Sequence, residues 1–160
     1  MGSLSAAHLS ALRVLVARLP LDEINWALTG STAHLLQGVP VEPHDIDVQT
    51  DEAGAWRAAE ALAAYCASPP RWTESQKMRS LLGSYAIEGI EIELIGALQK
   101  REPNGSWGTP ADPAEQRRVV GIEDIDVPVL TLEYEAVAYA EIGRHERAEL
   151  LREHCGRPHL

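Results

Sequence analysis

Two aspartates, Asp45 and Asp47, stand two residues apart in a segment where polar and apolar residues alternate. Such alternation predicts a β-strand with one buried face, so both carboxylates share the other face, about 6–7 Å apart along the backbone. Like charges so placed repel each other unless a divalent ion or an arginine neutralises them. The spacing therefore predicts a cation site. The alternative is that Asp45 caps a loop and Asp47 lies on a solvated strand face.

Glu91 and Glu93 repeat this geometry further along the chain. Ile90, Ile92 and Leu94 would form the buried face of a second strand, which leaves the two glutamates on the opposite face. An ordinary solvated strand face would show the same pattern. We expect one of the two, Glu93 before Glu91, to complete the metal site.

Gly30 and Ser31 lie between a short apolar run, 25–29, and a stretch with helical character, 31–36. At such a strand-to-helix turn, backbone amides, a hydroxyl and the positive end of the helix can all face a phosphate. Turns and helix caps use the same residues without any ligand. Phosphate also needs basic partners, and Arg79 is our first choice among the cations Lys77, Arg79, Arg117, Arg118, Arg144 and Arg147.

The composition narrows the class of protein. A length of 160 residues predicts a single domain, 1–160. The net charge of −10 disfavours nucleic acid as a partner. The two cysteines are far apart, which predicts neither a zinc site nor a disulfide. No signal peptide and no apolar run long enough to cross a membrane is present, so we expect a cytoplasmic protein without a membrane partner.

The remaining pattern predicts the elements that must position these residues. An opening helix follows a Ser5 cap and ends at Pro20, and a second helix runs from Asp51 to Cys66 until 68–70 break it. Next come a hairpin of strands 81–88 and 90–95, a loop over about 100–113, one or two strands within 119–130, and helices from about 131 to 154. We expect a mixed α+β fold in which a twisted sheet carries the carboxylates at one edge and helices cover its other face.

Three of these segments together resemble the signature of the nucleotidyltransferase fold superfamily: Trp26-Ala27-Leu28-Thr29-Gly30-Ser31, His44-Asp45-Ile46-Asp47-Val48 and Ile92-Glu93-Leu94-Ile95. Val127-Pro128-Val129-Leu130, leading into Glu133-x-Glu135-Ala136, is similar to small antibiotic nucleotidyltransferases of the lincosamide-modifying type. The resemblance covers about 20–152. It departs from the family at Thr29, where the family usually has a glycine, and at Glu93, where it often has an aspartate.

The resemblance implies a Mg²⁺-dependent transfer of a nucleoside monophosphate, with adenylyl the expected group, from ATP or another nucleoside triphosphate to a hydroxyl of a small molecule. Asp45, Asp47 and Glu93 would bind the metal, and Glu93 would help to deprotonate the acceptor. Gly30 and Ser31 would hold the β- and γ-phosphates. Antibiotic resistance follows as the expected role.

Other hypotheses remain. Thr29 motivates a non-catalytic or antitoxin-like protein of the same fold. An acceptor that is a protein would make the chain a protein-modifying nucleotidyltransferase, and the same carboxylates could activate water in a phosphohydrolase. Because only two helices remain after about residue 131 to shape an acceptor pocket, a homodimer that shares the pocket is a further expectation.

Overall fold

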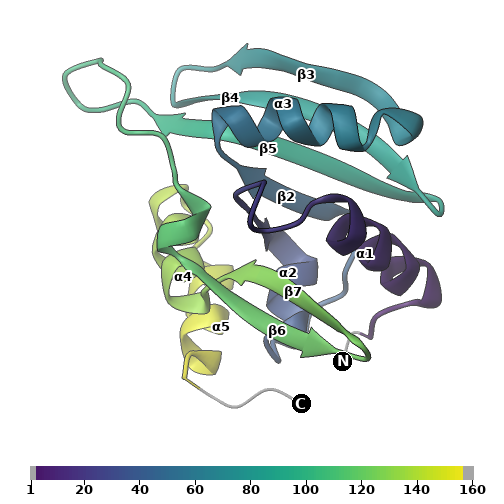
Figure 1. Ribbon diagram of the computed structural model, residues 1–160. Coiled ribbons are helices and arrows are strands. Elements are labelled where there is room, and N and C mark those ends of the chain that lie inside the picture. The colour runs from purple at the N-terminus through teal and green to yellow at the C-terminus, as the bar shows by residue number, and fades with distance from the viewer. Residues whose placement is uncertain (1–2, 157–160) are drawn as a thin grey trace.

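A seven-stranded mixed sheet organises the chain (Figure 1). The computed structural model describes residues 3–156, and within them the strand order is β3-β4-β5-β2-β1-β7-β6. The strands are β1 (Trp26–Thr29), β2 (Ile46–Thr50), β3 (Cys66–Glu74), β4 (Met78–Ile87), β5 (Ile90–Lys100), β6 (Arg117–Ile122) and β7 (Ile125–Leu130). The helices are α1 (Ala6–Arg18), α2 (Gly30–Leu36), α3 (Glu52–Ala61), α4 (Leu132–Glu141) and α5 (His145–His154), with short 3₁₀ turns at Ala63–Tyr65 and Pro113–Glu115.

The two strands that carry the predicted carboxylates are neighbours. β2 pairs with β5 in parallel, with Asp47 opposite Glu93, and β1 pairs with β2 antiparallel, with Thr29 opposite Asp47. These three residues therefore form one row across three adjacent strands. Because β3 and β6 occupy the two outer positions, the row lies in the middle of the sheet. The expectation of carboxylates at one edge of the sheet is wrong in this respect.

The opposite face of the same strands forms the hydrophobic core. Ile46, Val48, Ile92 and Leu94 are fully buried and belong to one cluster with residues of α1 and α3. α1 and α3 cover this face of the sheet (Figure 1). Period-two alternation thus sends the apolar side chains to one side and the carboxylates to the other, as the sequence pattern predicts.

Several predicted elements are confirmed. Ser5 caps α1, since its side chain accepts a hydrogen bond from the backbone N–H of His8. β4 and β5 form the predicted hairpin, and its tight turn has positive φ at both Glu88 (54°) and Gly89 (76°), which suits the right-handed twist of the strands. The predicted C-terminal helices are α4 and α5. The mixed α+β fold is confirmed as well.

The segment after α3 differs from the prediction. The helix expected from Asp51 to Cys66 ends at Ala61, and Cys66 instead begins β3. Pro69 and Pro70, expected to break a helix, lie within that strand. A strand at the outer edge of a sheet tolerates proline because one side of its backbone has no strand partner, and the pairing of β3 with β4 shifts register between Ser68 and Arg71.

Smaller differences concern boundaries. β2 begins at Ile46, so Asp45 lies just before the strand, and β4 and β5 extend beyond the predicted hairpin to Met78 and Lys100. Among the described residues, no helix is both long and apolar enough to cross a membrane.

Truncation of a core residue tests the packing beneath the carboxylate row. Leu94 is fully buried in β5, so Leu94→Ala should lower the free energy of unfolding by about 2–5 kcal/mol through lost apolar contact and the cavity left behind. Val119 in the outer strand β6 is 51% exposed, so Val119→Ala should change stability by about 0.5 kcal/mol or less. Chemical denaturation of both variants measures the difference, and equal losses would contradict the described core.

Candidate active site

A cavity of about 370 Å³ is lined by all three residues of the row, Thr29, Asp47 and Glu93. Strands β1 to β5, the first residue of α2 and helix α4 contribute to its walls, together with short connecting segments that include one residue just before α5. The charged side chains that line it are Asp47, Glu93 and Glu135 on the acidic side and Arg79, Lys100 and Arg144 on the basic side. A larger open groove of about 850 Å³ runs along α5, but none of the strand carboxylates lines it.

The carboxyl group of Asp47 has a strongly raised pKa. Its pKa is raised from the ordinary value of 3.8 to about 7, mainly by burial and then by the charges of Glu93, Asp45, Glu135 and Glu91, in that order of importance. Burial disfavours any charge, whereas the four neighbouring carboxylates create a field that favours positive charge. The row is therefore a place where a cation or a cationic group would be stabilised.

Asp45 and Glu91 form a second carboxyl pair beside the first. A hydrogen bond from Glu91 to Asp45, together with the charge of Asp45, raises the pKa of the exposed Glu91 side chain. Glu91 does not line the cavity, whereas Glu93 does and stands opposite Asp47. The structure thus brings both glutamates to the side of the aspartates and places Glu93 nearer to Asp47, the arrangement that its predicted role requires. That role itself stays a prediction.

The residue types fit a hard divalent cation, although they do not enclose one. Asp45, Asp47 and Glu93 offer carboxylate oxygens, the ligands that Mg²⁺ prefers. Within residues 3–156, no three acidic, histidine or cysteine side chains already surround a point that could hold an ion. Mutual repulsion among the carboxylates gives a physical reason for this, because a bound cation would relieve it.

The turn between β1 and α2 contacts Asp47 directly. Gly30 has φ +77°, and a Cβ at this position would overlap with Oδ2 of Asp47. The Gly30 amide donates to Oε1 of Glu135 at 3.1 Å, so it already has a partner within the protein. Ser31 is half-buried, and its Oγ accepts a hydrogen bond from the backbone of His44 at 3.4 Å. Gly30 lines the cavity beside the carboxylates, whereas Ser31 does not.

Arg79 is fixed at the edge of the same cavity. Its Nε donates to Oε1 of Gln99 at 2.7 Å, and its guanidinium lies 5.0 Å from the ring centre of Trp107 and 5.7 Å from that of Trp72. Arg101 covers Trp107 at 4.1 Å. These contacts hold a delocalised cation where a phosphate could meet it.

The other predicted basic partners are distributed over the molecule. Arg144 lines the cavity and stacks on Tyr139 at 5.0 Å. Arg117 instead binds Asn25 and the backbone of Trp26, and Arg147 lies 3.1 Å from the ring of His34. Lys100, which the sequence pattern did not single out, lines the cavity and pairs with Glu141 at 3.1 Å.

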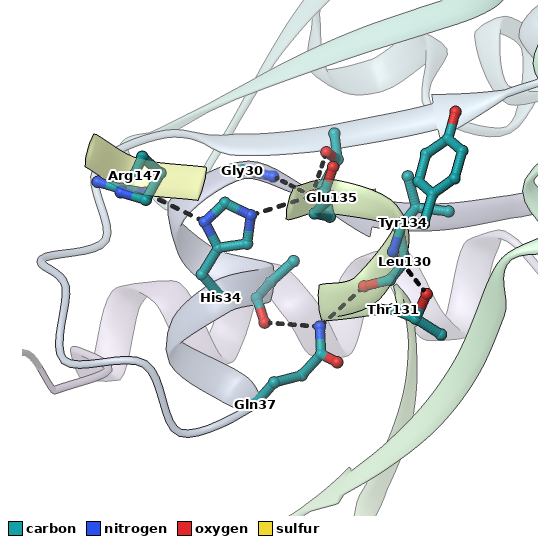
Figure 2. A network of polar contacts seen from close by, with 10 residues as sticks. Gly30, His34, Gln37, Leu130, Thr131, Tyr134, Glu135 and Arg147 are labelled. Atoms are coloured by element: carbon teal, nitrogen blue, oxygen red, sulfur yellow. Dashed lines mark hydrogen bonds and ion pairs between the residues drawn. The ribbon is translucent and has the colours of Figure 1, made fainter. Parts of the chain in front are cut away.

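Sequence reasoning missed the part played by Glu135. This residue is only 2% exposed, and its carboxylate accepts hydrogen bonds from the Thr29-Gly30 turn and from His34 (Figure 2). An acidic side chain between apolar positions in the first turn of a helix was the available signal. That signal is weak, because carboxylates at a helix N-terminus are common for electrostatic reasons alone.

Comparisons with known proteins identify the family and agree with the fold. Residues 11–154 match the model of a family described as aminoglycoside-2''-adenylyltransferase. A crystal structure from Thermotoga maritima, of a protein described as a nucleotidyltransferase, is 39% identical over 95% of this chain and 94% of that one, with a TM-score of 0.85. The lincosamide antibiotic adenylyltransferase LnuA, crystallised with lincomycin bound, shares the fold at 13% identity, 94% and 98% coverage and a TM-score of 0.56. No curated protein matches the sequence significantly. The resemblance seen in the sequence is thereby confirmed.

Two glycines with nearly equal backbone angles allow the contact between Gly30 and Asp47 to be tested. Gly89 has φ +76° but no heavy atom within 4 Å of an added Cβ. Gly89→Ala should therefore cost about 1–2 kcal/mol of stability from backbone strain alone. Gly30→Ala should cost more and should also displace the Asp47 carboxylate. Thermal unfolding and the Asp47 carboxyl signal in NMR measure both effects, and equal behaviour of the two variants would exclude the contact.

Burial of Asp47 and repulsion from the neighbouring carboxylates together predict that removing its charge stabilises the folded chain. Because the pKa of Asp47 is raised to about 7, its ionisation opposes folding as the pH rises from about 4 through 7. In metal-free buffer at pH 8, Asp47→Asn should raise the free energy of unfolding by about 1 kcal/mol, whereas the exposed Asp22→Asn should leave it unchanged. The gain should vanish near pH 4. Urea unfolding at both pH values checks this, and destabilisation at pH 8 would contradict it.

Proposed function

We propose that this chain, which belongs to the aminoglycoside-2''-adenylyltransferase family, transfers AMP from ATP to a hydroxyl of a small antibiotic-like molecule with the help of Mg²⁺. The observation that carries the proposal is the row Thr29, Asp47 and Glu93 across three central strands, with the cavity above it. The enzyme class, an adenylyl-transferring nucleotidyltransferase, agrees with the family match. The metal, the residue roles and the acceptor are the parts proposed.

Asp45 and two residues of the row, Asp47 and Glu93, have tasks in this reaction. Asp45 and Asp47 would hold the cation, and Glu93 would complete its site. When bound, Mg²⁺ neutralises charge on the attacking and leaving oxygens. Glu93, which faces the cavity next to Asp47, accepts the proton of the acceptor hydroxyl. The acceptor oxygen then bonds to the α-phosphorus, the bond from that phosphorus to the bridging oxygen breaks, and pyrophosphate leaves.

The basic wall of the cavity suits the triphosphate. Arg79, Lys100 and Arg144 lie on the lining that also holds the carboxylates, and guanidinium groups bind phosphate oxygens in pairs. Gly30 and Ser31 are the residues proposed to lie beside the β- and γ-phosphates, and of the two only Gly30 lines the cavity. The Gly30 amide is already bound to Glu135. Gly30 therefore contributes its missing side chain, which lets a phosphate approach the backbone closely.

Thr29 does not favour the non-catalytic alternative. Its backbone is extended, with φ −130°, so this position needs no glycine. Its hydroxyl donates to Oε1 of Glu135 at 2.6 Å. The departure from the two-glycine pattern is thus accommodated by a specific contact.

Transfer to a protein, or hydrolysis of a phosphoester, would need a different acceptor at the same cavity, and both are outcomes of the experiment below. The homodimer and the cytoplasmic location stay predictions.

Removal of the aspartate pair tests the proposal. We expect wild-type protein to bind ATP with Mg²⁺ saturably in a calorimetric titration and to release pyrophosphate when offered an aminoglycoside or a lincosamide. Asp45→Ala/Asp47→Ala should lower that release at least about 100-fold, because the charges that hold the cation are gone. Asp22→Ala, in an exposed turn, is the matched control.

The products separate the alternatives. Label from ATP on a protein rather than on the small molecule would point to protein modification, and hydrolysis of simple phosphoesters without a nucleotide would point to a phosphohydrolase. Absence of nucleotide binding by the wild type, or binding unchanged in the double variant, would overturn the proposal.

A further inference from the structure

Glu135 is a buried carboxylate with an unusual set of partners. A single oxygen, Oε1, lies 2.6 Å from Oγ1 of Thr29, 3.1 Å from the amide nitrogen of Gly30 and 3.1 Å from Nε2 of His34 (Figure 2). A buried charge is tolerated only where donors replace the lost water. Two of the three donors belong to the turn that borders Asp47. Glu135 therefore fastens this turn to α4.

The imidazole of His34 has one possible tautomer in this arrangement. Its Nδ1 lies 3.1 Å from Nη1 of Arg147, and a guanidinium can only donate hydrogen bonds. Nδ1 must therefore accept, which places the proton on Nε2, where it is directed at Glu135. His34 is fully buried, and the edge of one ring meets the face of the other where it packs on Tyr139. The hydrogen bond from His34 thus holds the Glu135 carboxylate in its orientation.

The network ends at the proposed catalytic row. Gly30 has no space for a side chain because Oδ2 of Asp47 occupies it, and Thr29 stands opposite Asp47 in the strand register. At its other end the network reaches α5 through Arg147, while α4 carries Glu135 and also lines the cavity through Tyr139. A continuous path of contacts therefore joins both C-terminal helices to the turn beside Asp47.

We propose that Glu135 is a positioning residue for adenylyl transfer: it holds the Thr29-Gly30 turn against Asp47, and His34 and Arg147 hold Glu135 in turn. The inference rests on the proposed function of the row, since only then does the place of Asp47 matter for a reaction. A carboxylate that merely tied α4 to the sheet would affect stability and leave the turnover of folded protein unchanged.

Glu135→Gln tests this with the smallest change of shape. The amide retains an oxygen that can accept, but the charge that draws three donors to one atom is lost. We expect kcat for pyrophosphate release with acceptor to fall about 10–100-fold, while KM for ATP changes by less than about threefold, because reacting groups are misplaced rather than lost. Glu133→Gln is the matched control, since Glu133 is exposed in the same helical turn and has no part in the network.

A second variant keeps the test valid if Glu135→Gln folds poorly. Arg147→Met removes the hydrogen-bond donor to Nδ1 of His34. We expect kcat to fall about 10-fold, the usual effect of losing a group that orients another side chain of a site. If the residues act through one path, Glu135→Gln/Arg147→Met should have a kcat no lower than that of Glu135→Gln alone, within about twofold. If the two losses in kcat multiply in the double variant, the residues act independently and the proposed path of contacts is wrong.

An NMR measurement separates the network from the activity. Ring nitrogen spectra of wild-type protein should show His34 protonated at Nε2 and not at Nδ1, and Arg147→Met should allow the other tautomer. His34 protonated at Nδ1 in the wild type would overturn the network. If the wild type transfers no AMP, the proposed function fails and the role of Glu135 in it fails too. If the wild type is active and folded Glu135→Gln keeps its kcat, only the positioning role is wrong.

Discussion

Parallel pairing of β2 with β5 sets Asp47 opposite Glu93, and the like-charge repulsion that results shapes the surrounding site. The pairing is driven by the other face of the same strands, where Ile46, Val48 and Leu94 are fully buried under α1 and α3. Apolar burial is the dominant favourable contribution to folding, so it can hold two carboxylates together against their repulsion. The electrostatic strain of Asp47 is thus a consequence of where the core side chains must go.

Such strain is common at binding sites, where a bound ligand can relieve it. The carboxylates of the cavity would be neutralised by a cation, and Arg79, Lys100 and Arg144 of the same lining would be neutralised by phosphate. A metal complex of a nucleoside triphosphate carries both kinds of charge. The cavity therefore complements this class of molecule better than it complements either a simple anion or a simple cation.

The β1–α2 turn brings a second constraint. Gly30 combines a left-handed backbone with contact to Asp47, while its amide is bound to Glu135. One residue therefore joins the row to α4, and through His34 and Arg147 to α5. In this arrangement the two C-terminal helices are part of the support of the site as well as part of the cavity wall.

Much of the fold and of the site follows from the sequence alone. Local alternation in 45–50 and 90–95 predicts which side chains share a face, and the Ser5 cap, the hairpin turn at Gly89 and the C-terminal helices carry their own local signals. The motif resemblance, which is evidence from the family and not from physical pattern, predicts that the two acidic strands meet, and the pairing of β2 with β5 confirms it.

Other features depend on contacts between distant segments, and local patterns do not encode them. The strand that contains Pro69 and Pro70 exists because it pairs at an outer edge, where a missing donor is tolerated. The central position of the carboxylate row follows from which strands take the two outer places. Glu135 lies 105 residues from Gly30 in the chain, so only the docking of α4 onto the sheet makes its buried charge a partner of the turn. Burial and partner choice are properties of the packed molecule, and for that reason the tertiary structure alone decided them.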